Sequence, residues 1–307
     1  RTVRYTESDC EQMASDARLL YSGDWRGELL KSRLRQEYTI DFSGKSQKAD
    51  YYIAGGYLND KGVFSTQKFE RFSARANLNY EVKKWLKVGM NMNLSHSVRE
   101  MSASSSMVWF LRTIPTIYPI YEYDPATGDY RRDTKGNLIY DYGANRQSWM
   151  QWNPLADAEY NVSPWMHDDA SFRTYMEIKI LPELTWRTNL SVDYYQYTYD
   201  GYTNSEYGYA AGYGGEAYKE SDRNFAYTVN NLLTYNKSFG EHTLTVLLGQ
   251  EAYSTHYKNL SASKRGFAFN GLTEINSASE MNSMSSYYTQ YRLLSWLSRV
   301  EYDFNDR

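Results

Sequence analysis

Cysteine is nearly absent from the sequence, since Cys10 is the only one among 307 residues. No disulfide can therefore form within the chain. Long apolar runs are also absent, and a membrane-spanning helix would need about 20 consecutive apolar residues. Charge of one sign is not in excess, because acidic and basic residues are mixed and the formal net charge is −3. Without a basic block, nucleic-acid binding is not expected.

Patterns typical of enzymes are missing as well. The four histidines, His96, His167, His242 and His256, show none of the spacings typical of metal ligands. No nucleophile elbow and no phosphate-binding loop occurs. The adjacent Asp168 and Asp169 would point to opposite faces of a strand, so they do not form a catalytic pair. We therefore expect no enzyme activity, no metal and no cofactor.

Aromatic residues are abundant, with 32 Tyr, 8 Trp and 11 Phe. Aromatic side chains favour β-strands, and in a membrane β-barrel they form girdles at both lipid interfaces. A low mean hydropathy of −0.73 is compatible with such a barrel, because only alternate residues of each strand face lipid. A soluble tyrosine-rich β-protein is the alternative.

Strict alternation is clearest between Phe69 and Val82. Apolar residues from Phe72 to Val82 occupy one face, and polar residues from Arg71 to Glu81 occupy the other. This segment is longer than a typical strand of about 5–6 residues. A tilted strand needs roughly 9–11 residues to cross the hydrocarbon of a membrane. The alternation therefore favours an all-β, antiparallel transmembrane barrel.

Segments of this kind recur along the chain, with occasional exceptions such as Asn231 on an apolar face and Leu232 and Leu247 on polar faces. We predict strands at residues 37–44, 50–58, 68–82, 85–98, 168–181, 184–198, 223–238, 242–258 and 289–304. Short turns and long polar connections alternate between these strands, as periplasmic turns and extracellular loops do in outer-membrane barrels. This rhythm divides the chain into an extracellular loop at 1–36 and a barrel segment at 37–307, with long extracellular loops at about 99–167, 199–222 and 259–288.

Nine strands do not make a complete barrel, because bacterial single-chain barrels have an even number of strands. An open sheet would also leave two unpaired edges in lipid. The sequence is therefore expected to be an internal segment of a longer polypeptide.

Several motifs have a familiar order. The stretch YTIDFSGKSQKADYYIAGGY at residues 38–57, continued by LNDKGVFSTQKFERFSARANL, resembles a hairpin region of the SusC/RagA family of TonB-dependent transporters. Further similarities are WLKVG at 85–89, IPTIYPIYEYD at 114–124, LPELT at 181–185, HTLTVLLGQE at 242–251 and the strand at 292–304. The resemblance implies a barrel of about 22 strands with a plugged lumen. It also implies a SusD-like lipoprotein partner, energy from TonB, and a plug and TonB-binding region outside this segment.

The long connection at 99–167 is rich in aromatic residues, whose faces can stack on sugar rings or hold peptide side chains. Candidate contacts with cargo or partner are Trp109, Tyr118, Tyr121, Trp149, Trp152 and Trp165, and Asn145, Arg146 and Gln151 could supply hydrogen bonds. Alternatively, these rings pack the connection against the barrel rim or the partner. Polar residues of the alternating strands are expected to face the lumen and the plug: Arg71, Arg75, Asn77, Asn79, Asn91, Arg187, Asn189 and Asp193.

These observations lead to a hypothesis of active import of an oligomeric nutrient across the bacterial outer membrane, with an oligosaccharide favoured over an oligopeptide. A surface β-rich binding protein or adhesin without transport is the main alternative. A barrel enzyme is a third, but no residue pattern indicates one.

Overall fold

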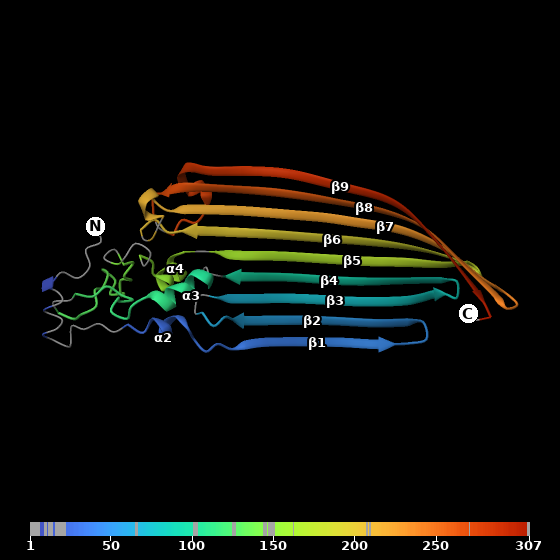
Figure 1. The fold of residues 1–307 in the computed structure, drawn as a ribbon, viewed down its shortest axis with the longest axis horizontal. Coiled ribbons are helices and arrows are strands. Elements are labelled where there is room, and N and C mark those ends of the chain that lie inside the picture. Colours follow the sequence, from blue (N-terminus) through green and yellow to red (C-terminus); the bar gives the residue numbers. More distant parts are fainter. Residues whose placement is uncertain are drawn as a thin grey trace.

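The computed structural model describes residues 7, 8, 11, 15, 23–64, 67–100, 104–124, 127–143, 146, 151–161, 163–206, 208, 210–269 and 271–305. Within this part of the chain, nine strands form one antiparallel sheet in the order β1 to β9, and each strand pairs with its sequence neighbours (Figure 1). The strands are β1 Arg35–Lys45, β2 Ala49–Lys61, β3 Lys68–Lys83, β4 Leu86–Glu100, β5 Pro164–Leu181, β6 Leu184–Thr203, β7 Glu216–Phe239, β8 His242–Phe267 and β9 Ala278–Phe304. This up-and-down order is the topology of a membrane barrel wall.

Cross-strand register makes the alternation continuous over the whole sheet. Residues directly opposite each other lie on the same face. Asn77 pairs with Asn91, Asn91 with Arg173, and Arg173 with Ser191. The neighbouring row joins Leu78 to Met90, and Met90 leads to Thr174 and Leu190. The sheet therefore has one polar face and one apolar face, as the sequence predicted.

Residues that break the alternation are accommodated by their cross-strand neighbours. Asn231 lies on the apolar face, where its amide donates to Oε1 of Gln250 across the β7–β8 pair at 3.0 Å. Leu232 lies on the polar face opposite Gly249, and Leu297 of β9 pairs with the same glycine. A side chain at Gly249 would meet Leu297 Cγ at 2.7 Å, so the glycine leaves room for the two leucines.

The later strands run further than predicted. β8 continues to Phe267 and β9 begins at Ala278, so their connection covers only 268–277, where the sequence suggested 259–288. Likewise, the β6–β7 connection covers only 204–215, because both strands extend into the loop that was expected at 199–222. These extensions carry charged residues on both faces, such as Glu220 on the polar face and Lys219 and Lys264 on the opposite one. A strand that projects beyond lipid needs no apolar face, so the alternation stops before the strand ends.

The long connections gather at one end of the sheet, and the short turns lie at the other (Figure 1). At the first end lie the helices α2 Trp25–Leu29, α3 Ser104–Thr113 and α4 Pro154–Tyr160. Single 3-10 turns occur at η3 Ala211–Tyr213 and η4 Ile275–Ser277. None of the helices in the described ranges is both long and apolar enough to cross a membrane.

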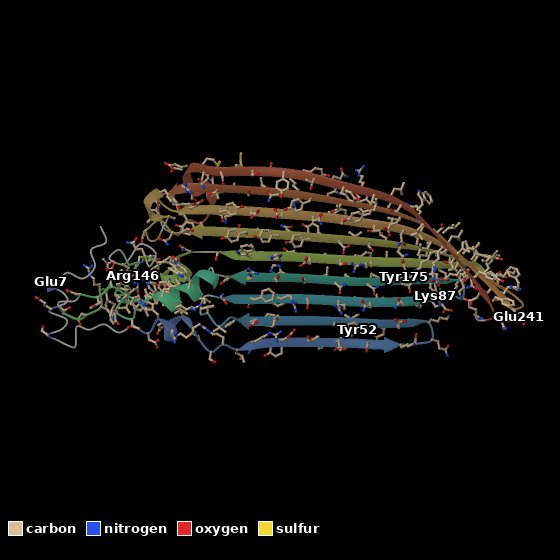
Figure 2. The ribbon with its side chains drawn as sticks, in the orientation of Figure 1. Glu7, Tyr52, Lys87, Arg146, Tyr175 and Glu241 are labelled. Atoms are coloured by element: carbon tan, nitrogen blue, oxygen red, sulfur yellow. The ribbon has the colours of Figure 1, made fainter. Side chains whose placement is uncertain are left out.

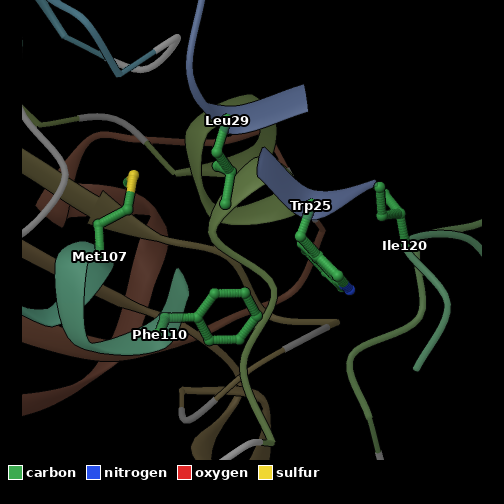
Figure 3. Packing of buried hydrophobic residues seen from close by; sticks show 5 residues of the cluster. All are labelled: Trp25, Leu29, Met107, Phe110 and Ile120. Atoms are coloured by element: carbon green, nitrogen blue, oxygen red, sulfur yellow. The ribbon is translucent and has the colours of Figure 1, made fainter. Parts of the chain in front are cut away.

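A small hydrophobic core holds these helices together. It consists of Trp25, Leu29, Met107, Phe110 and Ile120, all almost fully buried, and we call it the rim core (Figure 3). Its members come from α2, α3 and the segment that follows α3. The connection between β4 and β5 therefore folds together with α2 around a shared core at the end of the sheet.

Candidate functional site

Arg146 is the polar centre of the folded connection, at the end of the molecule opposite Glu241 (Figure 2). Its side chain is 1% exposed. The guanidinium donates to the carbonyl oxygens of Pro119 at 2.6 Å and Asp141 at 3.0 Å, and to Oδ2 of Asp141 at 2.9 Å. It also lies 5.3 Å from the ring centre of Trp25. The sequence suggested Arg146 as a ligand contact, but the buried side chain instead stabilises the connection.

Asn153 completes this arrangement. It is fully buried, and its amide donates to the carbonyl oxygens of Ile120 at 2.9 Å and Asp141 at 3.0 Å. Its Oδ1 accepts from the backbone N–H groups of Leu155 and Ala156, which caps the first turn of α4. The Asn153 side chain therefore links the first turn of α4 to the backbone at Ile120 and Asp141.

Asp157 of α4 is a carboxyl group of this unit with a strongly raised pKa. Burial raises the pKa of its carboxyl group to about 7 from an ordinary value of 3.8, although the Asn161 amide, at 3.2 Å, favours the charged form. The indole N–H of Trp152 also donates to Asp157. The folded connection therefore holds a carboxyl group whose protonation changes near neutral pH.

The candidate contacts from the connection have different surroundings. Trp152 packs edge-on against Phe110 at 5.4 Å, and Tyr121 packs against the rim core. The Tyr118 carbonyl accepts from the Trp25 indole at 2.9 Å, and the Tyr118 ring lies under Arg146. Trp109 on α3 is 45% exposed. Trp149 and Asn145 lie outside the described residues.

Trp165 lies on the polar face of β5, not in the folded connection. Its ring is 5.4 Å from that of Tyr197 and 5.1 Å from that of Tyr199, both on β6. Arg99 of β4 lies 5.4 Å above the same indole ring. The tryptophan therefore belongs to an aromatic group on the sheet.

All the predicted lumen residues lie on one face. The pairs Arg71–Ser97, Arg75–Asn93, Asn77–Asn91 and Asn79–Gly89 join β3 to β4, and the pairs continue through β5 to β6, where Arg187, Asn189 and Asp193 lie. Some of these side chains also donate hydrogen bonds to other polar residues of the same face. Arg75 donates to Asn93 at 2.9 Å, and Asn189 donates to Asn230 at 2.6 Å. The face offers hydrogen-bonding groups across several strands.

Tyr175 shows how this face is packed (Figure 2). Its ring crosses β4 over Gly89, and its hydroxyl donates to Oδ1 of Asn79 on β3 at 2.9 Å. A side chain at Gly89 would meet Tyr175 Cε1 at 2.1 Å. The glycine of the WLKVG motif is therefore needed for the tyrosine to lie flat, and Arg187 covers the other side of the ring at 4.3 Å.

Tyrosines dominate the polar face near the long connections, a feature that the sequence analysis missed. We call this region the tyrosine wall, and it comprises Trp165, His167 and Asp169 of β5, Tyr195, Tyr197 and Tyr199 of β6, Tyr218, Glu220 and Asp222 of β7, Tyr257 and Asn259 of β8, and Tyr287 of β9. Its signal was present in the sequence, because the odd-numbered positions that place Asn189 and Asp193 on this face continue to Tyr195, Tyr197 and Tyr199.

Polar groups link the rings of the tyrosine wall. The Tyr195 hydroxyl lies 3.4 Å from Nδ1 of His167. The amide of Asn259 donates to Oε1 of Glu220 at 3.1 Å, and the hydroxyls of Tyr257 and Tyr287 are 3.5 Å apart. The wall combines flat aromatic surfaces with carboxylates and amides. Across the described residues, no group of His, Cys, Asp or Glu is placed to hold a metal ion.

Comparison with known proteins gives a consistent picture. No family model matches the chain. TonB-dependent receptor P3 of Formosa agariphila is 28% identical over 92% of this chain and 28% of its own length. TonB-dependent receptor SusC of Bacteroides thetaiotaomicron is 22% identical over 92% of this chain and 29% of its own length. The chain thus spans less than a third of these curated relatives.

Solved structures agree on the fold. The RagAB peptide transporter matches with a TM-score of 0.74 and 24% identity, over 93% of this chain and 32% of the matched chain. The ferric citrate transporter FecA matches with a TM-score of 0.52 at 7% identity, over 88% of this chain and 32% of the other. These relatives are named receptors and transporters, which confirms the expectation of a non-enzymatic protein. In sequence and fold, the chain is therefore similar to a β-barrel segment of TonB-dependent outer-membrane proteins such as SusC and RagA.

Proposed function

We propose that the protein to which this segment belongs imports an oligomeric nutrient across the bacterial outer membrane. The observation that carries the proposal is a largely polar face that runs across the nine strands opposite a largely apolar face, with a few exceptions such as Leu232. One face suits a watery lumen and the other suits lipid. The long connections then lie outside the cell, and the short turns lie in the periplasm.

An oligosaccharide is favoured over an oligopeptide as cargo. The polar face combines tyrosine rings with carboxylates and amides, and aromatic faces with a few placed polar groups are a common means of orienting a ligand. RagAB is named a peptide transporter, so the peptide alternative is tested beside the glycan.

A SusD-like surface lipoprotein and TonB are the proposed partners, by analogy with SusC and RagAB. The folded connection with its rim core would meet the lipoprotein, and exposed Trp109 on α3 is a candidate contact. The lumen residues Arg71, Arg75, Asn77, Asn79, Asn91, Arg187, Asn189 and Asp193 would contact a plug or the moving cargo.

Deletion of the gene in its native bacterium tests the proposal. Growth on one class of oligosaccharide should be lost, and growth on the corresponding monosaccharide should be unchanged. Collapse of the proton-motive force should stop uptake of the labelled oligomer in wild-type cells. Normal growth of the deletion strain on every oligosaccharide and oligopeptide, together with lost adhesion to a surface, would instead support a non-transporting adhesin.

A further inference from the structure

A hollow of about 430 Å³ lies beside the tyrosine wall, mostly on the polar face. Its floor is made of small residues on neighbouring strands, among them Gly56, Ser73 and Ser95. A side chain at Gly56 would meet the Ser73 hydroxyl oxygen at 2.8 Å. Small residues therefore keep the sheet surface low here, and the taller rings of the wall begin at one border.

Charges of both signs border the hollow. Arg71 and Arg75 line it on the β3 side, and Asp169 lines it on the β5 side. Among the described residues, neither arginine has an ion-pair partner, and Arg75 donates only to the neutral amide of Asn93 at 2.9 Å. Asp169 accepts from the Ser95 hydroxyl at 3.3 Å and has no basic partner in the same ranges. Each charged group thus keeps hydrogen-bonding capacity for a molecule in the hollow.

The hollow and the wall meet at one cross-strand pair. Asp169 lies directly opposite Tyr195, so a carboxylate at the border of the hollow stands beside the first ring of the wall. In the adjacent row, Tyr197 pairs with Asp222. The surface therefore offers, in order, guanidinium donors, an open floor, a carboxylate and aromatic rings.

We propose that this surface binds the sugar rings of an uncharged oligosaccharide and discriminates against polyanionic and polycationic ones; the proposal rests on the proposed function and names its cargo more closely. Sugar hydroxyls both donate and accept hydrogen bonds, so they fit Asp169 and the arginines equally. The apolar faces of the sugar rings can stack on the aromatic ring of Tyr195. A polyanion would place like charge against Asp169, Glu220 and Asp222, and a polycation would place it against Arg71 and Arg75.

A glycan array tests the class of cargo with the complete transporter in detergent. The array should carry neutral, amino-bearing, uronic and sulfated oligosaccharides of several linkages and lengths. Binding should be strongest to neutral members. Binding mainly to charged members would overturn the charge argument, and binding to no glycan at all would overturn the glycan class, with a basic or acidic peptide panel then showing which oligomer replaces it.

Substitutions on two faces of one strand test the location. Tyr195→Ala should weaken binding of the best neutral glycan about fivefold to tenfold, because stacking on the ring is lost. Tyr195→Phe should keep most of the affinity. Tyr194→Ala is the matched control, since Tyr194 is the next residue of β6 and lies on the apolar face opposite Phe225. Equal losses for Tyr194→Ala and Tyr195→Ala would contradict the proposal.

A charge substitution tests the selectivity. Asp169→Asn should raise the affinity for uronic oligosaccharides relative to neutral ones, and Asp168→Asn on the opposite face should not. An unchanged ratio in Asp169→Asn would overturn the role of Asp169. Import by wild-type cells is measured separately. If Tyr195→Ala loses glycan binding but wild-type cells import no glycan, transport is refuted and the binding surface is not. If wild-type cells import the glycan and the variants bind it as well as the wild type does, only the binding surface is refuted.

Discussion

Arg146 illustrates what single residues contribute to this protein. A buried guanidinium is costly unless its donors are satisfied. Here Nη1 and Nη2 donate to the carbonyl oxygens of Trp152, Pro119 and Asp141, and two aromatic rings lie against the guanidinium. Among the described residues, Nε has no hydrogen-bond partner. The folded connection shares its small core with α2, so we expect this one side chain to contribute strongly to its stability.

Replacing Arg146 by alanine should therefore destabilise the folded connection by about 3–5 kcal/mol, the usual cost of breaking a buried ion pair. Hydrogen exchange of α3 and α4 in the complete transporter measures the change. Arg131→Ala is the control, because Arg131 is 66% exposed and pairs with Glu122, and such surface pairs contribute only about 0–1 kcal/mol. Similar protection of α3 and α4 in wild type and Arg146→Ala would show that the ion pair is not structural.

Sequence patterns could not identify this role. An arginine in a polar, aromatic connection reads as a solvated or ligand-binding residue, and only the three-dimensional arrangement shows that Pro119 and Asp141 surround it. Tyr195 and Tyr197 were missed for a different reason. Their alternation was visible in the sequence, but the sequence of one strand does not show that its rings join those of β5, β7 and β8 in one surface.

The bounds of individual strands were predicted correctly where apolar and polar residues alternate, as they must in a strand that crosses lipid. β3 was expected at 68–82 and occupies Lys68–Lys83, because apolar residues alternate with polar ones along its whole length. β9 was expected from 289 and begins at Ala278. Its first part, with the sequence ASEMNSMSS, has no apolar alternation, and backbone pairing with β8 holds it in place. Strand ends outside lipid are therefore set by pairing, which one strand's sequence does not reveal.

Helix α4 carries a prediction about pH. The folded connection binds the proton of Asp157 more tightly than the unfolded chain does, because its pKa is raised to about 7 from 3.8. The stability of the connection should thus be greatest below about pH 4, fall as the pH rises towards 7, and stay constant above that. Hydrogen exchange of α4 at several pH values, corrected for intrinsic rates, measures this.

Asp157→Asn is the control for that experiment. The amide is uncharged at every pH, so the decline between about pH 4 and pH 7 should disappear in this variant. If protection of α4 in the wild type instead increased with pH over this range, the Trp152 and Asn161 donors would outweigh burial, and the carboxylate would be the favoured form.

At the scale of the whole molecule, the sheet has one face suited to lipid and one face suited to water. Its apolar face carries Phe72, Leu78, Val88 and Leu94, and its polar face carries the hollow and the tyrosine wall. The fold class could be predicted from the sequence because this division repeats every second residue in strand after strand. The folded connection could not, since its core draws on α2 and on residues more than 75 positions later, and no local period links them.

Accessibility of adjacent positions on β4 and β6 tests this division most directly. Single cysteines at Asn91, Met92, Asn189 and Leu190 in a Cys10→Ser background carry a nitroxide label, and the complete transporter is reconstituted in liposomes. Relaxation by oxygen, which concentrates in lipid, should dominate at 92 and 190, and relaxation by a water-soluble nickel chelate should dominate at 91 and 189. The same preference at both positions of a pair, or the reverse order, would contradict a barrel wall between lipid and a watery lumen.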